Sequence, residues 1–149
     1  MRMKTLGYYN GTYDELENMM VPFDDRVCFF GDGVYDAGPA RNYHLFAIDE
    51  HIDRFFNSAK LMDIEIPCSK EELKELLASL VLKMDTGNNF VYWACTRGTG
   101  IRNHVYKKGP GNLWVMIKPE TLDTCQKPIK CVTQEDKRFF YCNCKTLNL

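Results

Sequence analysis

Two stretches in the middle of the chain carry apolar residues at helical spacing, and each predicts a helix with one buried face. The first follows Asp49, a good N-cap residue, and its apolar positions are Ile52, Phe55, Phe56, Ala59 and Met62. The second begins at Ser69 and Glu72, which can form a capping box because each side chain can satisfy the other residue's free backbone amide. Its apolar stripe comprises Leu73, Leu76, Leu77, Leu80, Val81 and Met84.

Strand-like segments lie on both sides of these helices. Leu6 to Tyr9 and Thr12-Tyr13 flank Asn10-Gly11, which is typical of a two-residue hairpin turn because both residues tolerate positive φ. Residues 89–97 alternate between two unlike faces, as a strand does. Leu113 to Ile117 is apolar on both faces, which favours a central strand.

A second hairpin is predicted over residues 34–47. Its first strand starts at Val34 and would be interrupted at Gly38-Pro39, and a turn near Arg41-Asn42 would lead to a second strand from Tyr43. Gly31-Asp32-Gly33 stands directly before it. Two glycines around one aspartate indicate a backbone bend, or a close approach that a Cβ would block.

The order of strands, two helices and strands predicts an α+β fold, in which an antiparallel sheet is covered by a helical pair. We expect residues 1–118 to form this first domain and residues 119–128 to form a linker. Residues 129–149 would begin a second domain, with a strand over Ile129 to Thr133.

Composition narrows the possible functions. The chain has 149 residues, 45% of them hydrophobic, which is enough for one domain with a real core. A net charge of −1 gives no electrostatic case for binding nucleic acid or an anionic membrane. Because the sequence has neither a membrane-length apolar run nor the apolar core of a signal peptide at its start, we expect a cytoplasmic protein.

Seven cysteines, irregularly spaced in a chain of this size, are expected to be free thiols. Cys142 and Cys144 could be combined with His44, His51 and His104 into a zinc site. Neither a paired CxxC nor a helical HxxxH spacing supports such a site, so no metal is expected.

Lys145 is the last of the chain's twelve lysines. A lysine amine attacks a carbonyl only when it is unprotonated, so a catalytic lysine needs a partly desolvated or cation-rich setting. Taken alone, a lysine is most often a solvated surface ammonium. Its interpretation therefore depends on the neighbouring motifs.

Four motifs together resemble the class IV aminotransferases, which use pyridoxal phosphate. They are Phe30-Gly31-Asp32-Gly33-Val34-Tyr35, Glu50-His51-Ile52-Asp53-Arg54, Thr96-Arg97-Gly98-Thr99 and Lys145-Thr146-Leu147-Asn148. Their order and spacing match over nearly the whole chain. Within that family the likeness is greatest to the D-amino acid aminotransferases, whose relatives are the branched-chain aminotransferases and the aminodeoxychorismate lyases. The implied fold is the N-terminal small domain of the D-amino acid aminotransferase-like fold.

The resemblance implies roles for five residues. Lys145 would be the Schiff-base lysine, and would carry the proton between the substrate Cα and the cofactor. Arg54 would bind the cofactor phosphate with its guanidinium. Tyr35, Arg102 and His104 would bind the substrate carboxylate, and the Arg-x-His pair favours a D-amino acid enzyme over the lyase. The implied reaction is a ping-pong transfer of an amino group between a D-amino acid and a 2-oxo acid.

The chain departs from the family pattern in three respects. Asp36 stands where a glutamate is usual, and Ile101 where a proline often precedes the arginine, so the shape of the substrate pocket would differ. Family members also continue beyond the lysine, through a second domain that supplies the carboxylate for the pyridine nitrogen and most of the phosphate site. They are homodimers in which a loop of one subunit completes the other's site. The alternatives are therefore an incomplete aminotransferase, a related enzyme of the family, or a non-catalytic domain that only folds and self-associates.

Overall fold

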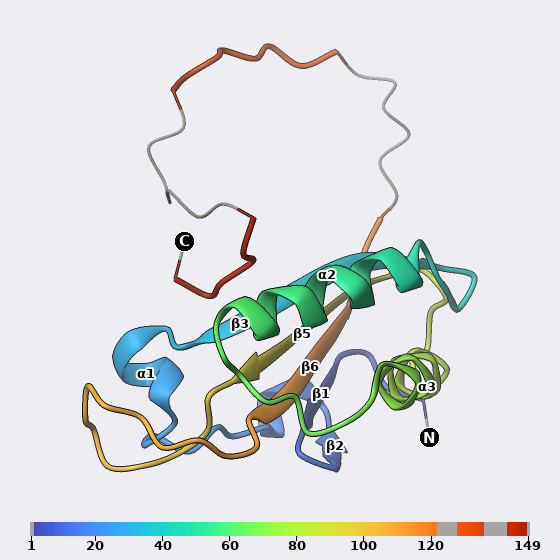
Figure 1. The fold of residues 1–149 in the computed structure, drawn as a ribbon. Coiled ribbons are helices and arrows are strands. Elements are labelled where there is room, and N and C mark those ends of the chain that lie inside the picture. The colour runs from blue at the N-terminus through green and yellow to red at the C-terminus, as the bar shows by residue number, and fades with distance from the viewer. Residues whose placement is uncertain (1, 122–127, 136–142, 149) are drawn as a thin grey trace.

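The computed structural model describes residues 2–121, 128–135 and 143–148, which build a six-stranded antiparallel sheet with the strand order β2-β1-β6-β5-β3-β4 (Figure 1). The strands are β1 (Leu6–Tyr9), β2 (Thr12–Asp14), β3 (Gly33–Arg41), β4 (His44–Leu45), β5 (Asn89–Thr96) and β6 (Asn112–Pro119). The helices are the short 3₁₀ helix η1 (Leu16–Asn18), α1 (Arg26–Phe30), α2 (Ile48–Leu61) and α3 (Lys70–Val81). The predicted α+β class is confirmed, and the apolar strand near residue 115 is β6, which lies between β1 and β5.

The core lies between one face of the sheet and helices α2 and α3. Both predicted apolar stripes are largely buried there, with Phe55 of α2 and Leu77 of α3 fully inaccessible to solvent. The sheet contributes Val91, Trp93 and Ile117 from the same face. Because fully burying a large apolar side chain stabilises a protein by roughly 1.5–3 kcal/mol, these stripes determine which faces the helices bury.

The two helices begin differently. Ser69 and Glu72 form the predicted capping box at the start of α3, with the Ser69 hydroxyl accepting from Glu72 N at 3.1 Å. The prediction that Asp49 caps α2 is wrong, because the N-cap is Ala47, a residue with φ of 47°. The Asp49 carboxylate lies in the first turn of α2, where it accepts a 2.6 Å hydrogen bond from Lys74 of α3.

The predicted interruption at Gly38-Pro39 does not occur. β3 continues through both residues, and Pro39 is paired with Phe90 of β5. The Pro39 carbonyl points away from β5 and accepts from Phe46 N. In a strand the N–H and C=O of one residue point to the same side, so the N–H that proline lacks would also have pointed away from β5. No hydrogen bond of the β3–β5 ladder is lost, which explains why the strand tolerates a proline.

The strand expected over Ile129 to Thr133 does not form. Residues 128–135 belong to no helix or strand, and Ile129 and Val132 are more than four-fifths exposed. A strand needs a partner edge for its backbone hydrogen bonds, and none of the described residues pairs with this segment. Most of the predicted linker, residues 122–127, lies outside the described residues.

Several expectations about single residues can be checked as well. Cys28, Cys68, Cys95, Cys131 and Cys144 are free thiols as predicted, while Cys125 and Cys142 lie outside the described residues. Within the described ranges no three His, Cys, Asp or Glu side chains are placed to hold a metal ion. No helix in this part of the chain is both long and apolar enough to span a membrane.

Candidate active site

Residues 143–148 lie along the outer edge of β3, next to its first residues (Figure 1). Tyr35 N donates to Lys145 O at 3.0 Å, and Leu147 N donates to Gly33 O at 2.9 Å. Between these bonds, Thr146 forms an antiparallel bridge with Val34. The main chain of Lys145 is thereby fixed to the strand that carries Tyr35.

The two glycines of the Gly31-Asp32-Gly33 motif make this docking possible. Gly31 ends α1 with φ of 58°, a left-handed conformation that favours glycine. A Cβ on Gly33 would lie 2.6 Å from Leu147 Cδ1 and 3.0 Å from the Cys95 carbonyl oxygen. The predicted bend and close approach are both confirmed, and the close partner is the segment that carries Lys145.

The Lys145 amine lies over an aromatic ring. Its Nζ is 4.2 Å from the centroid of Tyr35, which stacks in turn on Tyr92 at 5.4 Å. Burial, with a smaller contribution from Tyr35, raises the pKa of Tyr92 to about 12, so this phenol stays protonated at neutral pH. The structure thus brings together two of the predicted site residues, Lys145 and Tyr35, on the sheet face that α2 does not cover.

Arg54 projects from α2 and is held by a carboxylate. Its Nε and Nη2 each donate to one oxygen of Asp36, both at 2.7 Å, and His51 Nδ1 lies 2.8 Å from Asp36 Oδ1. The Asp36 side chain is fully buried, whereas that of Arg54 is 50% exposed. Nη1 of Arg54 makes no hydrogen bond within the described residues, so this end of the guanidinium is free for an anion.

The protonation states of this ion pair follow from its surroundings. Burial raises the pKa of Asp36, but hydrogen bonds from Arg54 and His51 outweigh burial and hold that pKa below its ordinary value. The hydrogen bond to Asp36 likewise raises the pKa of Arg54. Both groups are therefore charged at neutral pH. Asp36, which stands where the family usually has a glutamate, faces α2 rather than the open sheet face on which Tyr35 lies.

Ser58 is a site residue that the sequence did not single out. It is fully buried on α2, one turn beyond Arg54, and its hydroxyl accepts from Lys145 N at 3.1 Å. The available signal was a serine within an otherwise apolar stripe, three residues after Phe55.

Arg102 and His104 lie in the loop between β5 and β6, apart from the other three predicted residues. Arg102 Cζ is 5.1 Å from the Phe30 ring centroid, and the His104 ring is 5.6 Å from it. Both side chains are exposed. In the described part of the chain no hydrogen bond, ion pair or ring contact joins either residue to Tyr35 or Lys145, so these two residues form a group of their own.

The base of this loop is fixed although its tip is exposed. Asp32 accepts from Arg26 Nε at 2.8 Å and from Arg97 Nε at 2.9 Å, and Arg97 also donates to the Met62 and Asp63 carbonyls beyond α2. Burial raises the pKa of Asp32, but the two arginines outweigh burial and hold that pKa below its ordinary value. Asp32 of the glycine motif therefore ties the base of the loop to α1, and Arg97 ties it to the residues that follow α2.

Comparison with known proteins identifies the family. Residues 33–149 match the family model described as amino-transferase class IV. The chain belongs to the class IV aminotransferase family. A D-alanine aminotransferase of Staphylococcus epidermidis is 32% identical over 146 residues, which cover 95% of this chain and 52% of that protein. A D-alanine aminotransferase of Listeria monocytogenes is 38% identical over 141 residues, covering 91% and 49%. The chain thus spans about half the length of the curated relatives it matches.

Solved structures of this family share the fold. The Escherichia coli branched-chain amino acid aminotransferase superposes with a TM-score of 0.71 at 18% identity, over 77% of this chain and 40% of that one. The branched-chain aminotransferase of Thermoproteus uzoniensis, solved with norvaline, gives a TM-score of 0.66 at 18% identity, over 76% and 40%. At these identities the likeness establishes the fold alone.

The residues of this class IV aminotransferase chain fit two groups of pyridoxal phosphate. Lys145 is a half-buried residue whose main chain is fixed on both sides, so its amine is suited to bind an aldehyde. The free end of the Arg54 guanidinium is suited to bind a phosphate, because Asp36 occupies only its other edge.

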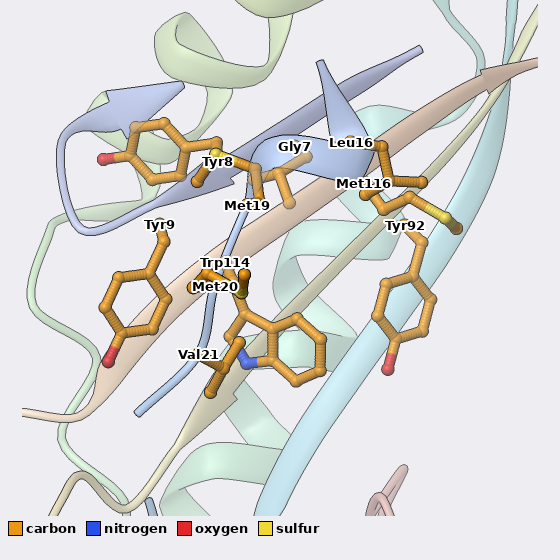
Figure 2. A pocket seen from close by; sticks show the side chains of 11 residues that line it. Gly7, Tyr8, Tyr9, Leu16, Met19, Met20, Val21, Tyr92, Trp114 and Met116 are labelled. Carbon is orange, nitrogen blue, oxygen red and sulfur yellow. The ribbon is translucent and has the colours of Figure 1, made fainter. Parts of the chain in front are cut away.

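An apolar cavity lies beyond Tyr92, on the sheet face that carries Tyr35 and that α2 does not cover (Figure 2). Its volume is about 300 Å³, and it lies between β1, β6 and the segment 16–21. The Tyr92 and Trp114 side chains line it, with ring centroids 6.2 Å apart. The rings of Tyr35 and Tyr92 stand between this cavity and the Lys145 amine.

Proposed function

We propose that this chain supplies the lysine-bearing part of a pyridoxal phosphate-dependent aminotransferase site, which transfers amino groups between a D-amino acid and a 2-oxo acid. One observation carries the proposal. Lys145 is hydrogen-bonded to Ser58 on α2, the helix that presents Arg54 one turn earlier. An amine and an anion-binding guanidinium whose main chains are joined through one hydroxyl suit a ligand with an aldehyde and a phosphate.

Each residue has a separate task in this proposal. When bound, pyridoxal phosphate supplies the electron sink that acidifies the Cα–H of an amino acid. Arg54 would hold the phosphate through Nη1, while Asp36 keeps its guanidinium oriented. Lys145 Nζ would hold the aldehyde and, once released from it, would move the proton at the substrate Cα. Because Nζ lies over the Tyr35 ring, it starts close to the phenol that would bind the substrate carboxylate.

The D-amino acid assignment has two supports. The relatives reported above are named D-alanine aminotransferases. Arg102 and His104 also offer a guanidinium and an imidazole on one exposed loop, which suits an α-carboxylate.

We propose further that the loop bearing Arg102 completes the site of a second copy of the chain. Arg102 and His104 lie against Phe30 of their own chain, and in the described residues no hydrogen bond, ion pair or ring contact joins them to Lys145 or Tyr35. Residues 1–118 would be the small domain, 119–128 the linker and 129–149 the start of the cofactor-binding domain. Sedimentation of the intact protein should show a dimer, and a monomer at every concentration would contradict this arrangement.

Chemical trapping tests the proposal directly. The chain is incubated with pyridoxal phosphate, reduced with borohydride and digested, and the modified peptide is located by mass spectrometry. We expect the phosphopyridoxyl mass on Lys145 at stoichiometric ligand, and its loss in Lys145→Ala. Lys118→Ala, which removes an exposed lysine at the end of β6, is the control and should be modified like the wild type. Labelling spread over many lysines, or none, would contradict the proposal.

A further inference from the structure

Ser58 uses its hydroxyl in two directions at once. Oγ donates to the Arg54 carbonyl at 2.9 Å, the bond that a serine often makes to the preceding helical turn. It also accepts from Lys145 N at 3.1 Å. One fully buried hydroxyl therefore connects the main chains of the two residues proposed to hold the cofactor.

A second contact reinforces this connection. The buried Cys144 thiol lies 3.6 Å from the Ser58 carbonyl, so two successive residues of the C-terminal segment are attached to the same point on α2. On the other side of the segment, Lys145 O accepts from Tyr35 N. The Lys145 main chain is thus held between a helix and a strand, and the direction in which its side chain leaves is fixed.

The Arg54 end of the connection is fixed as well. The Arg54 guanidinium is held by the buried Asp36 carboxylate, and the Arg54 main-chain carbonyl accepts a hydrogen bond from Ser58. A chain of hydrogen bonds therefore runs from Asp36 through Arg54 and Ser58 to Lys145.

From this geometry we infer that Ser58 is a positioning residue, which sets the spacing between the Lys145 amine and the Arg54 guanidinium. The inference rests on the proposed function, because that spacing matters for a ligand that must reach both groups. Removing the hydroxyl leaves the Lys145 amide without its acceptor and frees the segment from α2. A ligand that needs only the amine is then affected much less than one that needs the amine and the guanidinium together.

The test compares pyridoxal phosphate with pyridoxal, which has the aldehyde but no phosphate. Binding of each to the 149-residue chain is followed by absorbance for the wild type, Ser58→Ala, Ser58→Cys and Ser58→Thr. Cysteine preserves the size of serine but hydrogen-bonds weakly, whereas threonine keeps the hydroxyl. Ser79→Ala is the matched control, because Ser79 makes the same kind of bond to its own helix, to Leu76 O at 2.7 Å, on the exposed side of α3.

We expect the wild type to prefer pyridoxal phosphate, and the preference to fall roughly tenfold in Ser58→Ala and Ser58→Cys. It should recover in Ser58→Thr and be unchanged in Ser79→Ala. Equal losses for both ligands, or no loss, would overturn the positioning role while leaving the proposed function intact. A wild type that binds neither ligand, or binds both equally, would overturn both.

A second measurement needs no ligand and applies even to a weakly folded variant. Exchange of the Lys145 amide hydrogen, compared with that of Leu77 in the core of α3, should accelerate roughly tenfold in Ser58→Ala. An unchanged ratio between the two amides would overturn the inference.

Discussion

Lys145 and Arg54 are held by hydrogen bonds to buried side chains, whereas the side chains of Arg102 and His104 are exposed and lie against the ring of Phe30. Asp36 and Ser58 are both fully buried, and together they fix Arg54 and Lys145 through four hydrogen bonds (two from Arg54 to Asp36, two at the Ser58 hydroxyl). Arg102, by contrast, makes no side-chain hydrogen bond or ion pair within the part of the chain that the structure describes, and its guanidinium lies over the Phe30 ring.

The difference separates two requirements of the proposed site. Groups that hold a cofactor at two ends need a fixed spacing, and buried contacts on α2 and β3 provide it. Groups that bind a substrate from a second copy need to reach outward, and an exposed loop with an anchored base provides that. Substitutions in the first region should therefore change folding, and those in the second should change only activity.

The largest effect on folding is expected from Asp36→Asn. The change removes a charged acceptor of Arg54 and His51 from a buried position, and should lower the free energy of unfolding by about 2 kcal/mol at pH 7. Asp53→Asn is the control. It removes an exposed ion pair from α2, the helix that carries Arg54, and should have little effect. Chemical denaturation measures both, and equal losses would show that burial of the carboxylate does not matter.

The effect of Asp36 should depend on pH. Since the folded state lowers the pKa of this carboxyl, its stabilisation is complete above the unfolded value of about 4 and is lost as the pH falls through the lower folded value. The gap in stability between the wild type and Asp36→Asn should therefore be constant from pH 7 to about 5 and narrow below about pH 4. A gap that widens in acid would contradict the assigned charge state.

A smaller, local effect is expected from Gly33→Ala. The new Cβ would lie 2.6 Å from Leu147 Cδ1, so the Leu147 side chain must move and its packing against β3 is loosened. Amide exchange of Leu147 should accelerate roughly tenfold, with little change in α3. Gly100→Ala is the control, because its Cβ would meet no atom within 4 Å. Acceleration in both variants, or in neither, would contradict the close approach.

The smallest effect on folding, but a clear one on catalysis, is expected from Arg102→Ala. The side chain is exposed, so the melting temperature should stay unchanged. If the guanidinium binds the α-carboxylate, as the proposed function requires, kcat/KM for D-alanine should fall roughly 10- to 100-fold, taking about 1.4 kcal/mol per decade. Lys107→Ala, on the same loop, should leave kcat/KM unchanged. Equal losses of kcat/KM in the two variants would show that only the positive charge of the loop matters, not a specific contact of Arg102.

Local patterns in the sequence predicted much of this framework. The spacing of the apolar residues specified both helices, since a stripe at positions such as Phe55 and Leu77 has only one face to bury. The Gly31-Asp32-Gly33 motif indicated a close approach, and the motifs around Tyr35 and Lys145 indicated residues that the fold brings together.

What the sequence did not predict depends on partners distant along the chain. Pro39 is tolerated because its missing N–H would face away from β5, and the sequence alone does not show on which side β5 pairs with β3. Asp49 points to Lys74 on another helix instead of capping its own. Ser58 has its role only because Lys145 returns to α2 from 87 residues away.

The central claim, that Lys145 and Arg54 act on one ligand, is tested most directly by the affinities of pyridoxal phosphate and pyridoxal for the wild type and Arg54→Lys. Lysine preserves a charged partner for Asp36 but cannot also present a free guanidinium edge. We expect Arg54→Lys to bind pyridoxal phosphate at least roughly tenfold more weakly and pyridoxal equally well. Equal affinity of both proteins for pyridoxal phosphate would contradict the account.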